Sequence, residues 1–166
     1  DETTNIPITS DACDEPGTSL SVKTDDGTIY LTAGSELTIV KPNGEVITRD
    51  LSAGMSAWDD FAQVLYAARE GEADVNALDS NGDLVWTYTT EGTVTAIAEL
   101  GALSAAAVMV ETSNGAGTLL IIDGESGRLR SSTSTPTAAQ GLVASGNGAV
   151  LGMITSGQVH FYDLVE

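Results

Sequence analysis

The feature that most constrains this sequence is an internal repeat of about 40 residues. Four segments share a pattern of an apolar β-rich run, a strand-end residue that is often aspartate, a short polar turn and a further β-rich run. Aligned on Lys41, Asp79, Asp123 and Asp163, successive segments lie 38, 44 and 40 residues apart. This period, with several strands in each unit, is typical of β-propeller blades. We therefore predict an all-β fold of about four four-stranded antiparallel blades, forming a small or partial propeller.

Turn residues divide each unit into short strands. Asn43-Gly44 and Asn81-Gly82 are typical of β-hairpins, because both residue types tolerate positive φ, and Asp79 can accept hydrogen bonds from turn amides. The expected strands are 20–23, 28–32, 36–40 and 45–50 in the first unit, 56–60, 64–68, 74–78 and 84–88 in the second, 94–99, 105–111, 118–122 and 128–132 in the third, and 141–145, 149–155 and 158–162 in the fourth.

The fourth unit lacks an outer strand, and the N-terminal segment offers a replacement. Propellers commonly close by letting one terminus supply the missing strand of a blade at the other. Residues 4–8 (Thr-Asn-Ile-Pro-Ile) are the spare candidate, since Pro7 restricts them to a sheet edge. We therefore divide the chain into an N-terminal segment, residues 1–17, which supplies a closing edge strand, and a propeller-like repeat domain, residues 18–166.

The segment from Ala77 to Trp86 resembles the repeat of the quinoprotein-like propellers, a group that includes pyrroloquinoline quinone dehydrogenases and outer-membrane assembly lipoproteins. Their repeat reads roughly Ala-x-Asp, a short turn with Gly, and Trp four residues after the Gly, and Trp86 follows Gly82 by four. The third unit has Ser131 where this Trp would fall. The resemblance implies a blade fold over about residues 18–166, with Trp86 docking its blade on a neighbour. It does not extend to the enzymology, because no calcium ligands or base residues around a quinone map onto this chain.

The number of blades leaves three arrangements open. Quinoprotein-like propellers commonly have seven or eight blades, and propellers in general have 4 to 8. The chain closes as a four-bladed ring, or two chains form a composite ring as a homodimer, or the sequence is a fragment of a longer protein.

The net charge excludes several classes of partner. Twenty-four acidic residues against six Lys and Arg give a formal charge of −18. Such a surface repels nucleic-acid phosphates and anionic lipid headgroups, and it tolerates basic proteins and divalent cations.

No stretch approaches the roughly 20 apolar residues of a membrane span. Cys13 is the single cysteine, so an intrachain disulfide is excluded. The Thr- and Ser-rich, lysine-poor composition and a first residue other than Met lead us to expect an extracellular or cell-envelope domain whose signal or anchor lies outside this chain.

Metal and cofactor sites find little support. Residues 79–83 (Asp-Ser-Asn-Gly-Asp) place oxygen ligands at alternate positions, as calcium loops do, but Thr90 stands where the loop pattern requires Glu. A hairpin is therefore the preferred interpretation of residues 79–83. For the same reason we do not assign Asp25, Asp26, Asp123 or Glu125 as calcium ligands. One His and one Cys make zinc very unfavourable. We assign no metal, no cofactor and no cofactor-binding residue.

Catalytic residues are not assigned either. His160 is the single histidine. Strand alternation places it on one face with Tyr162, opposite Val159 and Phe161. The sequence offers no identifiable nucleophile or base partner for it. Asp59 and Asp60 are adjacent strand residues, which point to opposite faces. The glycine-rich run 114–117 has neither the Lys nor the helix of a phosphate-binding loop.

Aromatic residues concentrate in the second unit. They could form a platform for a sugar or peptide, but we favour packing between blades, because buried aromatics are common core material. The five are Trp58, Phe61, Tyr66, Trp86 and Tyr88.

The sequence therefore favours a non-enzymatic extracytoplasmic binding or scaffold domain that mediates protein–protein interaction through a loop face or a sheet edge. One alternative is a propeller-class enzyme acting on carbohydrate or alcohol substrates. Another is a self-associating structural domain. Fold alone does not decide between them.

Overall fold

The computed structural model describes residues 18–145, 148–155 and 157–164. Each repeat forms one antiparallel sheet whose strands are hydrogen-bonded in sequence order. The sheets contain β1 Ser19–Val22, β2 Ile29–Ala33, β3 Glu36–Val40 and β4 Val46–Asp50; β5 Met55–Asp59, β6 Val64–Ala68, β7 Asp74–Leu78 and β8 Leu84–Thr89; β9 Thr93–Glu99, β10 Ala105–Glu111, β11 Gly117–Asp123 and β12 Leu129–Thr135; and β13 Gly141–Ala144, β14 Val150–Thr155 and β15 Gln158–Asp163.

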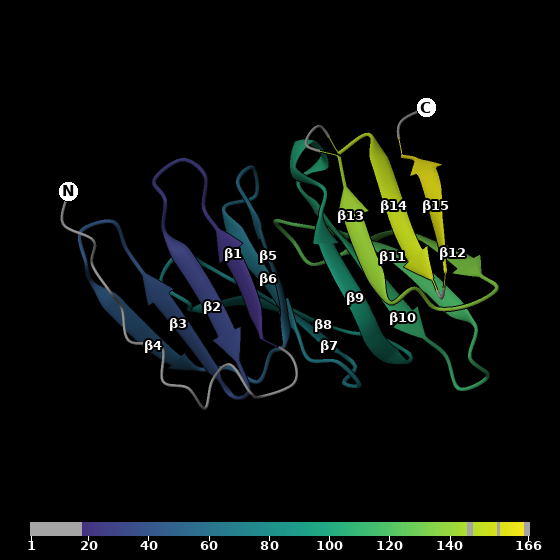
Figure 1. The fold of residues 1–166 in the computed structure, drawn as a ribbon, viewed down its shortest axis with the longest axis horizontal. Coiled ribbons are helices and arrows are strands. Elements are labelled where there is room, and N and C mark those ends of the chain that lie inside the picture. Colours follow the sequence, from purple (N-terminus) through teal and green to yellow (C-terminus); the bar gives the residue numbers. More distant parts are fainter. Residues whose placement is uncertain (1–17, 146–147, 156, 165–166) are drawn as a thin grey trace.

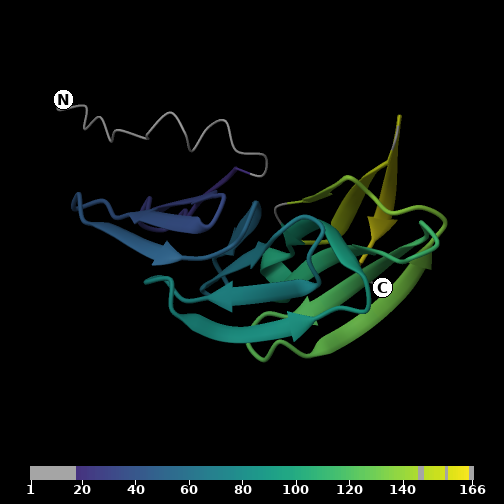
Figure 2. The ribbon, with the colours of Figure 1, turned by 90° about the horizontal axis from the view of Figure 1, so that it is seen from below.

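The four sheets follow one another around an arc. The first strand of each sheet is innermost: β1 contacts β5, β5 contacts β9, and β9 contacts β13. Figure 1 shows the β1–β4 sheet at one end of the molecule and the β13–β15 sheet at the other. Figure 2 shows the progression of sheets from a perpendicular direction. The prediction of propeller-type blades is confirmed.

Strand positions agree closely with the sequence expectation. Strands β3, β6, β7 and β10 begin and end at the predicted residues, and the other boundaries differ by up to three residues. The β13–β15 sheet has three strands, as expected. The proposed closing strand at residues 4–8 and Cys13 lie outside the described residues, so the role given to residues 1–17 stays a prediction.

Three apolar clusters hold the sheets together, one at each junction. The first cluster includes Tyr30, Leu37 and Leu65, the second includes Tyr66 and Val108, and the third lies between the β9–β12 and β13–β15 sheets. Alternation along a strand sends consecutive side chains to different clusters. In β11, Leu120 and Ile122 belong to the second cluster, whereas Leu119 and Ile121 lie at the third. Because both faces of the two middle strands are covered, β10 and β11 read as nearly continuous apolar runs, whereas the outer strand β12 is polar and exposed.

The two Asn-Gly turns form hairpins at the predicted places. Gly44 and Gly82 have φ values of +84° and +80°, but Asn43 and Asn81 do not adopt positive φ. Each asparagine instead precedes a single left-handed glycine. In the second turn the Gly82 amide donates to the Asp79 carbonyl, and the Asp79 amide to the Asp83 carbonyl. The predicted hairpins are present, and only the glycine of each Asn-Gly pair uses the positive φ that both residue types tolerate.

Helical structure in the described residues is limited to the 3-10 turn Gly101–Leu103. None of the helices in that part of the chain has the length and apolarity needed to cross a membrane.

Candidate interaction surface at the loop end

One end of the arc gathers the loops that follow the first and third strands of the sheets. Antiparallel connection places these loops together, because alternate strands run in the same direction. We call this region the loop end. In the first three sheets its segments are 23–28, 41–45, 60–63, 79–83, 100–104 and 124–128.

Aspartates fix the shape of these loops. The Oδ1 atom of Asp79 accepts hydrogen bonds from the backbone amides of Asn81 and Asp83 at 2.8 and 2.9 Å. Asp26 accepts from the Thr28 amide at 2.8 Å, and this bond is the main reason that the pKa of Asp26 lies below its ordinary value. The expected role of strand-end aspartate is confirmed. The carboxylates of the 79–83 segment that resembled a calcium loop are thus partly engaged in building a hairpin.

Asp123 has the most strongly stabilised carboxylate of the loop end. Its Oδ1 accepts from the Ser126 hydroxyl at 2.7 Å and from the Ser126 amide at 2.8 Å. Its Oδ2 forms a 2.6 Å ion pair with the Arg130 guanidinium. The Ser126 hydroxyl, and then Arg130, hold the pKa of Asp123 far below its ordinary range. Arg130 is therefore committed to the loop rather than to a ligand.

The first and second sheets are joined at the loop end by aromatic stacking. The rings of Tyr30 and Trp58 are parallel, with centroids 4.9 Å apart. The indole Nε1 of Trp58 donates to Asp60 Oδ1 at 2.7 Å, and the hydroxyl of Thr24 donates to Asp60 Oδ2. The ammonium of Lys23 lies 5.6 Å from the centroid of the Trp58 ring. These contacts hold loop 23–28 against loop 60–63.

A tryptophan joins the second and third sheets, beside a buried carboxylate of the second sheet. Asp59 is fully buried and accepts from the Tyr66 hydroxyl at 2.8 Å, while its other oxygen accepts from the amides of residues 61 and 62. Burial, and then the charge of Asp59, raise the pKa of Tyr66 well above its ordinary value. Trp86 Nε1 donates to the Gly124 carbonyl at 2.8 Å. The expectation that Trp86 docks its blade on a neighbour matches this contact.

The predicted aromatic cluster is divided rather than continuous. Trp58 packs at the first junction, and Tyr66, Trp86 and Tyr88 pack at the second. Phe61 is 65% exposed and does not join either cluster. Four of the five aromatics are therefore blade packing, as favoured from the sequence.

The structure separates the residues considered for catalysis. Asp59, the last residue of β5, points to the second junction, and Asp60, the first residue of the following turn, points to the first. In the β14–β15 pairing, His160 lies opposite Met153 and Tyr162 lies opposite Leu151. His160 and Tyr162 therefore share the face that is turned to the third sheet. Val159 and Phe161 lie on the other face. Within the described residues, His, Cys, Asp and Glu do not form a group of three or more suited to a metal ion.

Exposed carboxylates on the turns of the loop end give this surface a negative charge. They include Asp25, Glu45, Asp83 and Glu125, beside the exposed Asp26 whose carboxylate is bonded within its own turn. Of the first four, three have a cation within 4 Å: Lys23 lies 3.3 Å from Asp25, Lys41 3.5 Å from Glu45, and Arg49 3.7 Å from Asp83. Such exposed pairs are worth little and open easily to a competing cation. This surface can attract a basic group without any rearrangement of its backbone.

Sequence reasoning missed a second surface, the outward face of the β13–β15 sheet. It forms an apolar hollow of about 330 Å³ lined by Val143, Ala144, Ser145, Val150, Gly152, Ile154, Val159 and Phe161. The signal was present as alternate apolar residues in β14 and β15, but only the location of a neighbouring sheet tells which face is covered.

Comparison with known proteins gives the fold. No protein-family model matches the chain, and no curated protein matches it in sequence. Among solved structures, it is similar to hydrazine synthase from Kuenenia stuttgartiensis, with a TM-score of 0.72 and 18% identity over 97% of this chain and 50% of that one. It is also similar to a chain of the mitotic checkpoint complex, with a TM-score of 0.71 and 12% identity over 89% and 49% of the two chains. A further similar structure is that of the dihydro-heme d1 dehydrogenase NirN, with a TM-score of 0.66 and 14% identity over 88% of this chain and 34% of that one. The chain spans about half the length of the first two, and the likeness shows a β-propeller-type fold.

Proposed function

We propose that this chain is a non-enzymatic binding or scaffold domain that recognises a basic segment of a protein partner at its loop end. The observation that carries the proposal is the set of exposed carboxylates on turns whose shape is fixed by hydrogen bonds from backbone amides to Asp or Asn side chains. Preorganised loops lose little conformational entropy on binding, and a negative surface accelerates association with a positive partner.

The comparisons support a binding role without specifying it. One similar chain belongs to a multiprotein complex, the mitotic checkpoint complex. The neighbours also include enzymes, so the argument for this chain depends on the loop end itself. Here the strand-end aspartates serve the turns, and Asp59 and Asp60 are directed to different junctions.

The proposal extends to repeat type and location. The Trp86 contact with Gly124 supports repeats of the quinoprotein-like kind. The Thr- and Ser-rich, lysine-poor composition supports a secreted or cell-envelope domain.

The test is calorimetric titration with a Lys- and Arg-rich peptide and with an acidic peptide of equal length. One variant neutralises the loop end through Asp25→Asn, Glu45→Gln, Asp83→Asn and Glu125→Gln. The matched control removes four charges at the opposite end through Glu70→Gln, Glu72→Gln, Glu91→Gln and Glu111→Gln, all of which are exposed.

We expect the basic peptide to bind the wild type and to lose affinity at high salt, because the interaction is electrostatic. The loop-end variant should bind about tenfold more weakly, a change of about 1.4 kcal/mol, and the control should bind like the wild type. Equal weakening in both variants would mean that only the overall charge attracts the peptide, and it would reject the loop end as the site.

A further inference from the structure

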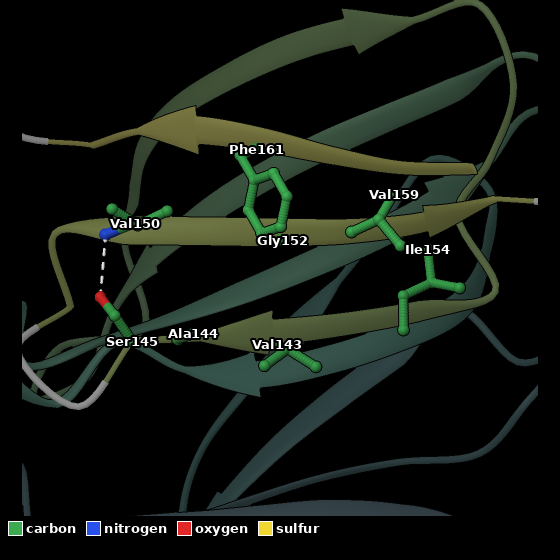
Figure 3. Close-up of a pocket in the computed structure, with 8 residues that line it drawn as sticks. All are labelled: Val143, Ala144, Ser145, Val150, Gly152, Ile154, Val159 and Phe161. Atoms are coloured by element: carbon green, nitrogen blue, oxygen red, sulfur yellow. Dashed lines mark hydrogen bonds between the residues drawn. The ribbon is translucent and has the colours of Figure 1, made fainter.

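The outward face of the β13–β15 sheet is an uncovered apolar surface. We call it the terminal face. Figure 3 shows the side chains of Val143, Ile154, Val159 and Phe161 on one side of this sheet. Phe161 is 75% exposed and Val143 59%. Single exposed apolar residues are ordinary, but a contiguous patch of them marks an interaction site.

The terminal face repeats the pattern that the preceding sheets use to bind the next sheet. In β6 and β10, alternate residues pack on the following sheet: Val64, Tyr66 and Ala68 in the first strand, and Ala105, Ala107 and Met109 in the second. The corresponding second strand of the last sheet is β14, whose alternate residues Val150, Gly152 and Ile154 line the terminal face. The terminal face is thus built as a junction, although no described sheet covers it.

The first sheet offers the complementary half of such a junction. We call the side of this sheet that faces away from the second sheet the leading face. Leu20 and Val22 of β1 are 64% and 47% exposed there, because Ser21 and Tyr30 point the other way, to the first junction. In each later sheet the equivalent side is covered by the preceding sheet, as Leu65 is by the first and Leu151 by the third.

We propose that the terminal face of one copy packs on the leading face of a second copy, so that two chains form one composite propeller. This contact would have the same form as the three junctions within the chain, where one face of each sheet packs on the opposite face of the next sheet. Two copies supply twice the four sheets, and the chain spans 50% and 49% of the two propeller neighbours named first above. A ring of eight sheets lies within the usual range of 4 to 8 blades.

Charge sets the conditions for this assembly. The residues that line the hollow of the terminal face are uncharged, whereas Asp163, the β15 partner of Val150, lies exposed at its edge. Each copy also carries a formal charge of −18, so two copies repel at low ionic strength. Salt screens this repulsion over the distance between subunits and strengthens apolar burial. Association should therefore be stronger at high salt, opposite to the binding of a basic peptide at the loop end.

The experiment measures the molar mass of the full 166-residue chain by light scattering at low and high salt. We expect about 34 kDa at high salt, twice the 17.0 kDa of one chain. Phe161→Asp on the terminal face and Leu20→Asp on the leading face should each raise the dimer dissociation constant about tenfold or more. Each substitution places an unpaired carboxylate in the contact between the two copies, where burial is costly. Leu84→Asp is the control, because Leu84 is 62% exposed on the outer strand β8 and belongs to neither face.

Mixing the two variants makes the test specific for this geometry. Phe161→Asp keeps its leading face and Leu20→Asp keeps its terminal face, so the mixture should form one intact junction and regain a heterodimer. A wild type that stays at 17.0 kDa at both salt concentrations would overturn the proposal. So would a Leu20→Asp variant that still dimerises, because the terminal faces would then be pairing with each other. Far-ultraviolet circular dichroism of every variant establishes that it is folded.

Discussion

The indole nitrogen of Trp86 donates a 2.8 Å hydrogen bond to the carbonyl oxygen of Gly124, which joins the last strand of one sheet to a turn of the next. The same ring lies against Gly127, where a Cβ atom would approach the indole Cδ2 to 2.8 Å. One side chain thus fixes the relative position of two blades by a directional bond and by close packing.

Replacement of Trp86 should therefore weaken the whole molecule. We expect Trp86→Phe to lower the free energy of unfolding by about 1 kcal/mol, the value of the hydrogen bond, and Trp86→Ala by about 3 kcal/mol, because the packing is lost as well. Urea denaturation measures both. Val85→Ala is the control, since Val85 is exposed beside Trp86 and should change stability by less than about 0.5 kcal/mol. A Trp86→Ala loss as small as that of the control would show that Trp86 does not hold the junction.

Gly124 itself has no room for a side chain. A Cβ atom there would lie 2.3 Å from the Tyr66 hydroxyl and 2.8 Å from the Ser104 carbonyl oxygen. We expect Gly124→Ala to destabilise by about 1–3 kcal/mol through overpacking, measured as a fall in the urea midpoint. Gly115→Ala separates crowding from backbone strain, because Gly115 has a positive φ of +79° but open space around it. A larger effect at Gly115 than at Gly124 would contradict the close approach of the two sheets.

Two buried tyrosines in consecutive blades should respond oppositely to loss of the hydroxyl. The Tyr30 hydroxyl is buried and has no hydrogen-bond partner in the described part of the chain, whereas the Tyr66 hydroxyl donates to the buried Asp59. Tyr30→Phe should be neutral or should stabilise by up to about 1 kcal/mol, because an unsatisfied polar group is removed. Tyr66→Phe should destabilise by about 1–3 kcal/mol, because a buried carboxylate loses its partner.

Thermal melting of the two phenylalanine variants at pH 7 makes this comparison. Both substitutions remove one oxygen atom and keep the ring, so they are matched controls for each other. A loss of stability at Tyr30 equal to that at Tyr66 would mean that the Tyr30 hydroxyl is bonded in solution.

Asp123 should make stability depend on acid. Its pKa is lowered in the folded protein by the Ser126 hydroxyl and then by Arg130, so its contribution is present above the unfolded pKa and is lost as pH falls toward the folded value. The advantage of wild type over Asp123→Asn should be constant above about pH 5 and should shrink below about pH 4, where an unfolded aspartate begins to protonate. Urea titrations of both proteins at successive pH values measure this difference. Taking the difference removes the general effect of the −18 charge on stability, because both proteins share it. An advantage that grows on acidification would contradict the lowered pKa.

Much of the fold was accessible from the sequence because its determinants are local. Glycines at fixed places, as at Gly44 and Gly82, set the hairpins, and the period of about 40 residues set the number of sheets. Alternation along β15 correctly placed His160 and Phe161 on opposite faces, since side chains of a strand alternate whatever lies beyond it. The places of the Asn-Gly turns were predicted, whereas the positions with positive φ are seen only in the structure, because loop length as well as residue type decides them.

Tertiary structure alone decided which apolar faces are covered. The sequence of β14 and β15 resembles that of buried strands, and nothing local distinguishes Phe161, which is 75% exposed, from Leu151, which is fully buried. The same limit applies to the loop end, where Asp59 and Asp60 are neighbours in the chain but bind partners at different junctions. Turn geometry and alternation follow from contacts between residues close in sequence, whereas burial and partners depend on which sheet lies alongside, and that is fixed only when the blades pack.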